Sequence, residues 1–538
     1  MKNRSRLHSI IVLLFLLPIL TLLASRSDKT SAANSAVEQF VDTTVEPDSN
    51  NAAVANCRYG TSPDIKGEQT HVIPQLGAGW YLTFSTFPPQ PPPDNGADFA
   101  HMIFVVQNKN GPVYLPSYKT IPALNSTFGN YIRDNPGKLW IVGNEVDRGP
   151  NPGSLERVQG DTFPEIYALA YHEVYNFVKA NDPTAQVANS GLVQVTPGRL
   201  QYLDTMWDTY VKEFGTAMKV DVWTMHLYVL PEVHPDGTPN GIANVALGSD
   251  PAIGKRSSGG DPNACSDPDV YCFAEHDDLS IFAEQIRAMR QWMANHGQRQ
   301  KPLIVTEYSI LLPYELKDGV CEFLIDENGE CFTPTRVSEF MDGSFDYLNS
   351  AIDPTLGYSL DNNRMVQQVM WFAVHSSGAG ASSNLVKDNL VTLTQIGQTF
   401  QSRALSETPY RNLLVDHVQN VAVKAGAGGT ATAEIAVTFR NNGNTKVNQP
   451  FTVTFYKDAA RTMPIDSVSF TAAVPGCTSR AYAASVEWSG LAKGTHQYWV
   501  HIDSTNSIVE SPSNDTDNIG SGWVFVVDDQ VLVPVVRR

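Results

Sequence analysis

The chain has 538 residues, of which 42% are apolar, 10% aromatic and 17% charged, the composition of a globular protein. This length exceeds one ordinary domain and favours a large domain joined to a smaller one. The formal net charge of -18 argues against a nucleic-acid partner, which would call for a basic face, and fits an extracellular protein that stays soluble.

Residues 1–25 have the pattern of an export signal. Three basic residues among the first six precede an apolar stretch from Ile10 to Leu23, as in a signal peptide. No Ala-x-Ala site follows the stretch directly, so an uncleaved N-terminal anchor is the alternative. Residues 26–56 are rich in Ser, Ala, Asn and Thr and are expected to be a low-complexity linker. The rest of the protein is therefore expected to be secreted or held at the cell surface.

Between residues 57 and 404, strand-like and helix-like segments alternate. This alternation predicts a parallel sheet of the α/β class, and a (β/α)8 barrel if the sheet closes. A Thr162-Phe-Pro-Glu165 capping box is expected to open one helix, and Gly297 to end another that begins near Leu279. Seven strands are predicted, at Val72–Leu82, His101–Gln107, Leu139–Val142, Gln186–Val193, Val220–Tyr228, Leu303–Glu307 and Val369–His375.

A closed barrel requires eight strands, one more than this pattern provides. The gap falls between Asn108 and Gly137, where Val113–Tyr118 is a poor strand candidate, so the missing strand is expected to be the third. Loops of unusual length in a compact domain are commonly functional. Two are expected on the active face, at 229–275 and at 310–333, and the Pro-rich insert at 87–95 after the first strand could join them.

Two apolar runs end abruptly in a glutamate, Leu139-Trp-Ile-Val-Gly-Asn-Glu145 and Pro302-Leu-Ile-Val-Thr-Glu307. A continuous apolar run predicts a strand buried on both faces. A carboxylate just past such a strand lies at the carboxyl end of the sheet, where α/β folds place their chemistry. On the count above, Glu145 follows strand four and Glu307 ends strand seven. Two such carboxylates predict the acid and the nucleophile of a glycoside hydrolase.

Gly143-Asn-Glu145 and Thr306-Glu-Tyr308 resemble the acid/base and nucleophile motifs of clan A glycoside hydrolases, which are (β/α)8 barrels. The resemblance implies a retaining enzyme that acts on a β-linked polysaccharide or oligosaccharide, with Glu145 as acid/base and Glu307 as nucleophile. It is nearest to β-1,3-glucanase-like families, although Val146 stands where a proline is common. Glu145 is expected to have a raised pKa and to start protonated, while Glu307 is ionised. No metal or organic cofactor is implied, because two carboxylates and water suffice.

The same resemblance implies roles for four more residues. Asn144 would hydrogen-bond the sugar 2-hydroxyl, and His226-Leu-Tyr228 resembles the His-x-Tyr whose tyrosine holds the nucleophile. A structural or substrate-contacting role explains His226 as well as proton transfer does. Trp371 resembles the aromatic platform under the reacting sugar, with a core position as the equal alternative. Two weaker subsite candidates at strand ends are His101 and Trp80.

Six cysteines fit an oxidising compartment. Two pairs are close enough in sequence to close a surface loop each, Cys265 with Cys272 and Cys321 with Cys331. Neither pair is flanked by histidines as a zinc site would be. Cys57 and Cys477 are left over and are expected to be free, although spacing does not fix the connectivity.

Residues 412–528 change to period-two alternation, which predicts an all-β sandwich of immunoglobulin-like size. Thr438–Gly443 and Ile508–Asn518 resemble the CARDB family, an immunoglobulin-like bacterial surface module. Trp488 and Trp499 could stack on carbohydrate but are expected to lie in the core.

The last residues, 529–538, are expected to be a tail. The sandwich or an uncleaved anchor would provide cell-surface association. Two alternatives to a hydrolase stay open. One is a non-catalytic surface protein that binds glycan or mediates adhesion on the same barrel. The other is a transglycosylase, which differs only in whether sugar or water accepts the intermediate.

Overall fold

The computed structural model describes residues 55–527, with gaps at 65, 312–315, 318–319, 322–324, 479 and 512–515. The signal or anchor, nearly all of the linker and the tail expected from the sequence lie outside the described residues and stay predictions. Within the described part, no helix has both the length and the apolar character needed to cross a membrane.

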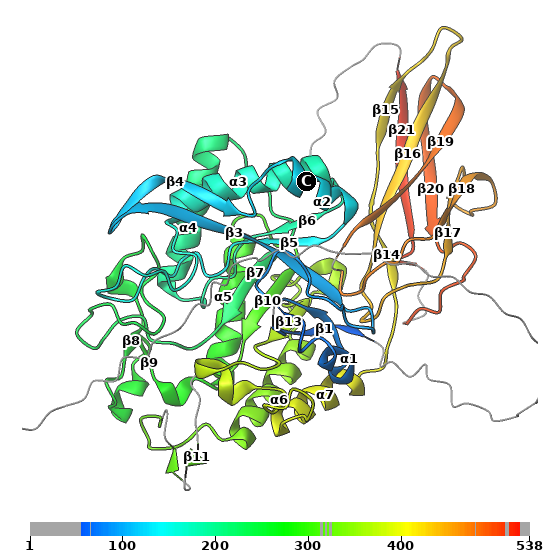
Figure 1. The fold of residues 1–538 in the computed structure, drawn as a ribbon. Helices are drawn as coiled ribbons and strands as arrows, with labels where there is room; N and C mark the ends of the chain where they lie inside the picture. Colours follow the sequence, from blue (N-terminus) through cyan, green and yellow to red (C-terminus); the bar gives the residue numbers. More distant parts are fainter. Residues whose placement is uncertain are drawn as a thin grey trace, which may run out of the picture. The chain divides into compact units, whose positions relative to one another are not determined.

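Eight parallel strands form a nearly closed barrel in which spatial order follows chain order (Figure 1). A single bridge between Ala188 and Val222 joins the fifth strand to the sixth. The barrel strands are β1 Asn56–Thr61, β2 Ala78–Tyr81, β3 Asp98–Asn110, β5 Leu139–Val142, β6 Gln186–Ala188, β7 Trp223–Leu227, β10 Leu303–Tyr308 and β13 Gln368–Trp371.

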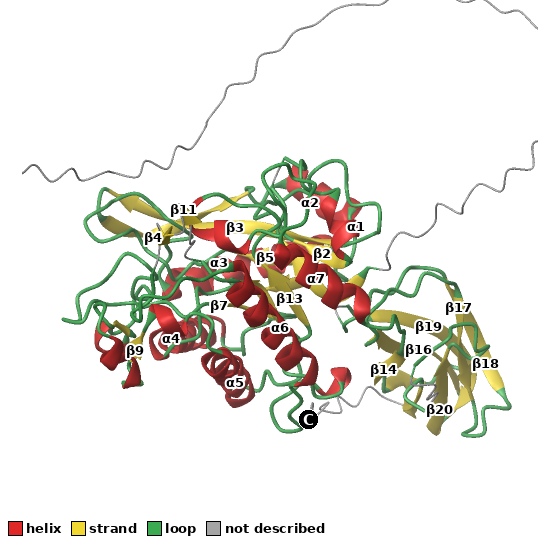
Figure 2. Ribbon diagram, turned by 90° about the horizontal axis from the view of Figure 1, so that it is seen from below, coloured by secondary structure: helices red, strands yellow, loops and turns green. Residues whose placement is uncertain are grey.

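Seven α-helices of the described part surround these strands, as Figure 2 shows in red. They are α1 Val72–Leu76, α2 Ser126–Asp134, α3 Pro164–Asn181, α4 Pro197–Phe214, α5 Leu279–Asn295, α6 Pro334–Ser350 and α7 Gln395–Ser406. The described chain between β2 and β3 contains no α-helix, so one of the eight strand–helix units is incomplete. Strand residues alternate between a core shared with the helices and a smaller core inside the barrel, which includes Ile141, Ile304 and Met370.

Further strands and 3-10 turns lie between the barrel strands and the helices. The short strands are β4 Val113–Ile121, β8 Arg256–Ser257, β9 Val270–Tyr271, β11 Leu316–Lys317 and β12 Val320–Cys321. The 3-10 turns are Pro251–Ile253, Pro262–Ser266, Phe273–Glu275, Ser359–Asp361 and Gly378–Ser383. Five of these ten elements fall in the long loop expected at 229–275, which is therefore structured.

The strand missing from the sequence analysis is the first, not the third. β1 is buried along its whole length, but its polar residues and its position at the end of the linker concealed it. Val113–Tyr118 does lie in a strand, β4, which forms an antiparallel hairpin with β3 instead of joining the barrel. The insert at 87–95 therefore follows strand two. The expected and the actual position of the missing strand both come before Glu145, so the strand count at Glu145 is unchanged and that residue still follows strand four.

Two local expectations were wrong. Val72–Leu76 is a helix, which Gly77 ends with φ 73, so only the last part of the expected strand is extended. The capping box at Thr162 is absent: α3 has Phe163 as its N-cap, with no side-chain cap and a proline in its first turn. The stop at Gly297, which has φ 69 just after α5, is confirmed.

The C-terminal part is a β-sandwich of two sheets with one apolar core. One sheet contains β14 Leu413–Val418, β16 Thr430–Asn441 and β19 Tyr482–Ala492. The other contains β15 Val421–Lys424, β21 Ile519–Val527, β20 Gly494–Ile502, β17 Phe451–Tyr456 and β18 Pro464–Phe470, in that spatial order. Trp488 lies in the core as expected. Trp499 does not: it is half-buried and its inward neighbours Tyr498 and Val500 fill the core instead.

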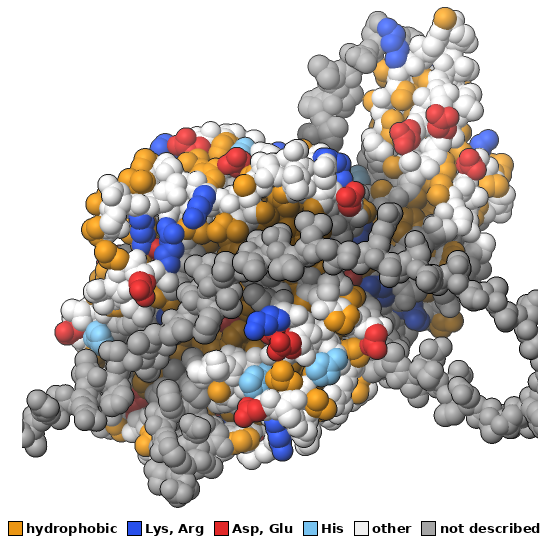
Figure 3. Space-filling view, in the orientation of Figure 1, with side chains coloured by type: hydrophobic (Ala, Val, Ile, Leu, Met, Phe, Trp, Pro, Cys, Tyr) orange, Lys and Arg blue, Asp and Glu red, His pale blue; other side chains and the backbone are white. Residues whose placement is uncertain are grey.

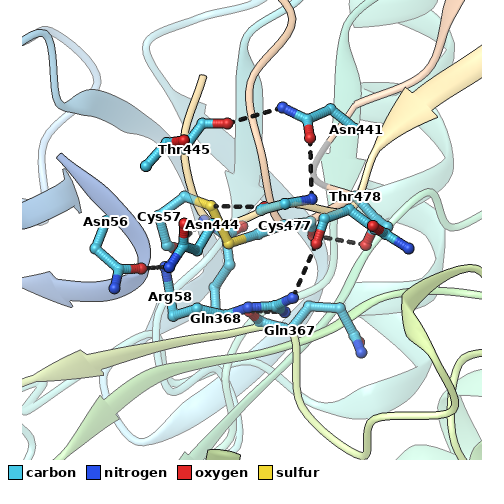
Figure 4. The surroundings of a disulfide bond; sticks show 12 residues. Asn56, Cys57, Arg58, Gln367, Gln368, Asn441, Asn444, Thr445, Cys477 and Thr478 are labelled. Atoms are coloured by element: carbon cyan, nitrogen blue, oxygen red, sulfur yellow. Dashed lines mark hydrogen bonds between the residues drawn. A yellow bond between two sulfur atoms is a disulfide. The ribbon is translucent and has the colours of Figure 1, made fainter. Parts of the chain in front are cut away.

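Cys57 and Cys477, expected to be free, form a disulfide between β1 and the sandwich (Figure 4). Cys57 N also donates to Asn444 O at 2.9 Å, and Arg58 of β1 donates to Asn442 O at 3.2 Å. The first barrel strand is therefore bonded to the sandwich by covalent and polar contacts.

The expected bridge between Cys265 and Cys272 is confirmed. The side chain of Cys321 lies outside the described residues, so its pairing with Cys331 stays a prediction. On the face shown in Figure 3, basic and acidic side chains lie among one another, with uncharged areas between them.

Candidate active site

Glu145 stands in a tight turn directly after β5. Gly143 has φ 91, and a Cβ there would come within 2.6 Å of Val146 Cγ1, so glycine is required. Glu145 itself has φ 42, a left-handed conformation that costs about 1–2 kcal/mol for a residue with a side chain. Two backbone hydrogen bonds hold it, from Glu145 N to Gly191 O at 3.0 Å and from Arg148 N to Glu145 O at 3.1 Å. The turn holds this carboxylate at the carboxyl end of strand four.

Glu307 reaches the same end of the barrel from β10. In the register of β10 with β7, it lies opposite His226. Tyr228, two residues farther on, donates its hydroxyl to Glu307 Oε1 at 2.7 Å. His226 fits because position 191 is glycine, where a Cβ would come within 2.4 Å of the imidazole ring. The structure thus contains the tyrosine–glutamate contact that the His-x-Tyr resemblance implied.

His226 lies between the two glutamates. Its Nδ1 is 3.4 Å from Glu145 Oε1 and 3.8 Å from Glu307 Oε2. One oxygen of each carboxylate and one imidazole nitrogen all lie within 4.8 Å of one another. The Glu145 and Glu307 side chains are 7% and 10% exposed, so the pair is largely desolvated but still reaches the surface. Two carboxylates this close cannot both ionise freely, because like charges repel in a low dielectric.

The two carboxyl groups have different proton affinities. Burial, together with the Glu145 charge, raises the pKa of Glu307 to about 7, against the opposing effects of His226 and Tyr228. Burial also disfavours the Glu145 anion, but the hydrogen bond and charge of His226, with the charge of Arg148, outweigh it and lower the Glu145 pKa below its usual value. These directions are opposite to the expected order, because Glu307 has the raised pKa and Glu145 the lowered one in the ligand-free protein. Burial disfavours protonated His226, but the Glu307 and Glu145 charges raise its pKa above the usual value.

The same three side chains could also hold a metal ion. Their two oxygens and one nitrogen are compact enough for a divalent cation such as zinc or iron. The other such group in the described chain includes both sulfurs of the Cys265–Cys272 bridge, which are oxidised and therefore poor ligands. Glu145, His226 and Glu307 are thus the residues on which a metal requirement should be tested.

Three other expected site residues occupy different environments. Trp371 is fully buried, with its ring 5.1 Å from that of Tyr308 and its Nε1 donating to a backbone carbonyl, so it is a core residue and not a sugar platform. His101 is 2% exposed and stacks on Trp140; burial lowers its pKa to about 4. Trp80 fills the barrel interior and borders a cavity at the amino ends of the strands, which is the wrong end for a subsite.

Asn144 is 6% exposed beside Glu145 and donates to Gln159 Oε1 at 3.3 Å. Two half-buried aromatic residues that the sequence analysis missed follow barrel strands at this end. Phe84 comes after β2 and Phe372 directly after β13, with ring centroids 6.0 Å apart in an edge-to-face arrangement. Because side chains alternate along a strand, Trp371 faces the helices, and its neighbour Phe372 is the better candidate for sugar contact.

A buried ion network behind the Glu145 turn was also missed. Arg199 of α4 is 1% exposed, pairs with Asp147 through Nε at 2.9 Å and also pairs with Glu232 through Nη1. Asp147 comes two residues after Glu145, and Glu232 begins the loop at 229–275. Arg199 therefore ties the Glu145 turn to that loop. Its partners are distant in sequence, so no local pattern could have revealed the network.

Comparison with known proteins gives likenesses of structure only. No protein-family model matches the chain, and no curated protein matches it. Similar solved structures include a GH128 subgroup II endo-β-1,3-glucanase from Pseudomonas viridiflava, with 14% identity and a TM-score of 0.38, covering 65% of this chain and 98% of that one. A GH128 subgroup I endo-β-1,3-glucanase from Amycolatopsis mediterranei, in complex with laminaritriose, has 14% identity and a TM-score of 0.37, covering 64% and 99%.

For the C-terminal part, the CARDB domain of a Pyrococcus furiosus protein, in complex with di-metal ions, has 18% identity and a TM-score of 0.18, covering 23% of this chain and 99% of that one. The structural neighbours are thus of the two kinds that the sequence motifs resemble. At these scores they add no argument about activity, which depends on the geometry of the site.

Proposed function

We propose that the barrel is a retaining glycoside hydrolase that cleaves a β-linked polysaccharide or oligosaccharide. The proximity of Glu145 and Glu307 carries this proposal, since an oxygen of each lies within 4.8 Å of the other. Retaining enzymes hold their two carboxyl groups about 5–5.5 Å apart, whereas inverting enzymes need about 6.5–9.5 Å to admit a water molecule. A buried pair with divergent pKa values at the end of a barrel also fits catalysis better than glycan binding alone.

Glu145 would act as acid/base and Glu307 as nucleophile. In the first step Glu145 gives its proton to the glycosidic oxygen, the bond from that oxygen to the anomeric carbon breaks, and Glu307 bonds to the carbon. In the second step Glu145 takes a proton from water, whose oxygen displaces Glu307 and releases the sugar. The Tyr228 hydroxyl supports the nucleophile role, because it stabilises the Glu307 anion and fixes one of its oxygens.

The substrate class proposed is a β-linked glucan, and laminari-oligosaccharides are the first to test, since one neighbour above was crystallised with laminaritriose. We further propose that the protein acts outside the cell, as its N-terminal pattern and disulfides suggest.

The deciding experiment is the anomeric configuration of the first product, followed by proton NMR during hydrolysis of laminari-oligosaccharides. We expect the β-anomer to form first and then to mutarotate, whereas initial α-anomer would exclude retention. Glu307→Gln should abolish turnover, and the matched control Glu339→Gln, at an exposed position on α6, should not.

Trapping the intermediate with a 2-deoxy-2-fluoroglycoside and mapping the labelled peptide by mass spectrometry would assign the roles. Label on Glu307 is expected, and label on Glu145 would exchange the two roles. A protein that binds the sugars without any hydrolysis would be the glycan-binding alternative, and transfer to added sugar in place of water would identify a transglycosylase.

A further inference from the structure

The outer face of the five-stranded sheet in the sandwich carries a row of aromatic side chains. From Tyr498 on β20 and from Gly522 on β21, every second residue is buried, namely Tyr498, Val500, Ile502, Gly522, Val524 and Val526. The residues between them face away from the core. Among these, Trp523 and Phe525 are each 40% exposed, and Trp499 is half-buried. On the next strand, β17, Tyr456 is also half-buried on this face.

The strand register places these four residues in one oblique line. Tyr456 lies directly opposite Trp499. Trp499 lies opposite Ser521, so Trp523, two residues along β21, is its diagonal neighbour, and Phe525 continues the line. Direct pairs are about 5 Å apart, diagonal pairs about 7–8 Å, and alternate residues along a strand about 7 Å, so the row extends on the order of 20 Å. A line of this kind offers several separate ring faces on a rigid sheet.

The residues directly beside the rings on β20 and β21 are polar and uncharged. The register places Gln497 opposite Trp523, Thr495 opposite Phe525 and Ser521 opposite Trp499. The strands that carry the row, β17, β20 and β21, contain no Asp or Glu. Within the same sheet, β15 contains Lys424 and the edge strand β18 contains the exposed Asp466.

The opposite sheet differs. On β14, β16 and β19 the acidic residues Asp416, Glu434 and Glu487 lie outside the core. Acidic residues are therefore absent from the three strands that carry the aromatic row, in a chain whose net charge is -18.

We propose that this aromatic row binds a neutral, β-linked polysaccharide chain. Sugar rings in such chains present flat C–H faces that stack on aromatic rings, and hydroxyl edges that hydrogen-bond to Ser, Thr and Gln. The charge pattern selects this occupant, because nucleic acid or an anionic membrane would require a basic surface. Contiguous exposed apolar groups on a soluble protein also mark an interaction site. The identity of the polysaccharide rests on the proposed function of the barrel, but the binding itself requires no hydrolysis.

The test is co-sedimentation of the full chain with insoluble β-1,3-glucan. Glu307→Gln serves as the parent, so that the glucan is not degraded. We expect saturable binding by the parent, weakened roughly tenfold by Trp523→Ala, which corresponds to about 1.4 kcal/mol, and abolished when Trp499 and Phe525 are also replaced by Ala. The matched control is Val509→Ala, an apolar residue of the sandwich that is 86% exposed and lies outside the sheet.

Thermal melting of each variant establishes that it folds. Parent-like binding by the triple variant, or no binding by the folded parent, would overturn the proposal. In a background with Glu307 restored, Trp523→Ala should hydrolyse soluble laminari-oligosaccharides at the normal rate. If hydrolysis fails in every protein while aromatic-dependent binding persists, the proposed function of the barrel fails and the sandwich site stands.

Discussion

Removal of the Tyr228 hydroxyl should change the pH dependence of catalysis in a defined way. In Tyr228→Phe, Glu307 loses a hydrogen bond of 2.7 Å that favours its anion. A hydrogen bond to a charged group contributes about 1.5–3 kcal/mol, and one pKa unit corresponds to about 1.36 kcal/mol. The Glu307 pKa should therefore rise by about 1–2 units from its value of about 7 in the parent.

The sign of the effect on rate follows from the shared proton. The proposed mechanism needs the proton on Glu145 and an ionised Glu307, whereas in the ligand-free protein the pKa of Glu307 is raised and that of Glu145 is lowered. Kinetically, activity should fall in the parent as pH rises through about 7, where the pair loses this proton. A higher Glu307 pKa makes the active form rarer below that pH, so kcat/KM should drop roughly 10–100-fold. The higher Glu307 pKa also shifts the alkaline side of the pH–activity profile to higher pH, by about 1–2 units.

At alkaline pH the two proteins should converge. There the fully ionised pair predominates, and the active form depends only on the affinity of Glu145 for its proton. The assay is kcat/KM on a laminari-oligosaccharide across the pH range, with Tyr210→Phe as control, because that hydroxyl contacts His172 on the outer helices. A deficit of equal size at every pH would show that Tyr228 only orients Glu307, and would refute the shared-proton argument.

Three further predictions follow from groups outside the glutamate pair. Arg199→Met leaves two buried carboxylates unpaired and should lower the free energy of unfolding by about 3–5 kcal/mol, measured by chemical denaturation. The control Arg403→Met, at a partly exposed ion pair, should lower it by less than about 1 kcal/mol. Equal losses in the two variants would contradict the buried network. Replacing both Cys57 and Cys477 by Ser removes a bridge between residues 420 positions apart and should cost about 2–4 kcal/mol in the same assay; an unchanged midpoint would show that the bridge adds no stability. Exhaustive treatment with a chelator should leave hydrolysis intact, and a loss restored by one added divalent metal would assign the site to metal chemistry instead.

The barrel could be predicted from sequence because its signal lies in local runs of apolar residues. Leu139–Val142 and Leu303–Glu307 are buried on both faces, so they contain no polar alternation and end visibly at a glutamate. β1 could not be recognised in this way, because Asn56 and Arg58 within it are buried only through partners far along the chain. Arg58 pairs with Asp361 at 2.6 Å. A strand stabilised by tertiary ion pairs has no local apolar pattern.

The sequence identified the glutamates, His226 and Tyr228 that the structure brings together, but not the direction of each side chain. Trp371 and Phe372 are neighbours, and sequence alone does not tell which of them faces the helices. The pairing of Cys57 with Cys477 could not be predicted either, because it depends on how the sandwich contacts β1 and not on the spacing of the cysteines in the sequence. Local patterns therefore place residues on elements, whereas contacts between elements decide what each residue touches.

The pKa values of the two glutamates show most clearly that contacts between elements, and not local patterns, decide the properties of a residue. Glu145 and Glu307 both follow apolar strands, so their local sequences give no reason for their pKa values to differ. The difference comes from His226, which hydrogen-bonds Glu145 at 3.4 Å and lies 3.8 Å from Glu307. We expect the leaving-group oxygen of a bound sugar to compete with His226 for Glu145. Loss of that hydrogen bond would raise the pKa of Glu145. Movement of the imidazole toward Glu307 would lower the pKa of Glu307. The proton order needed for catalysis would then be set by the substrate, because one histidine nitrogen serves both carboxylates.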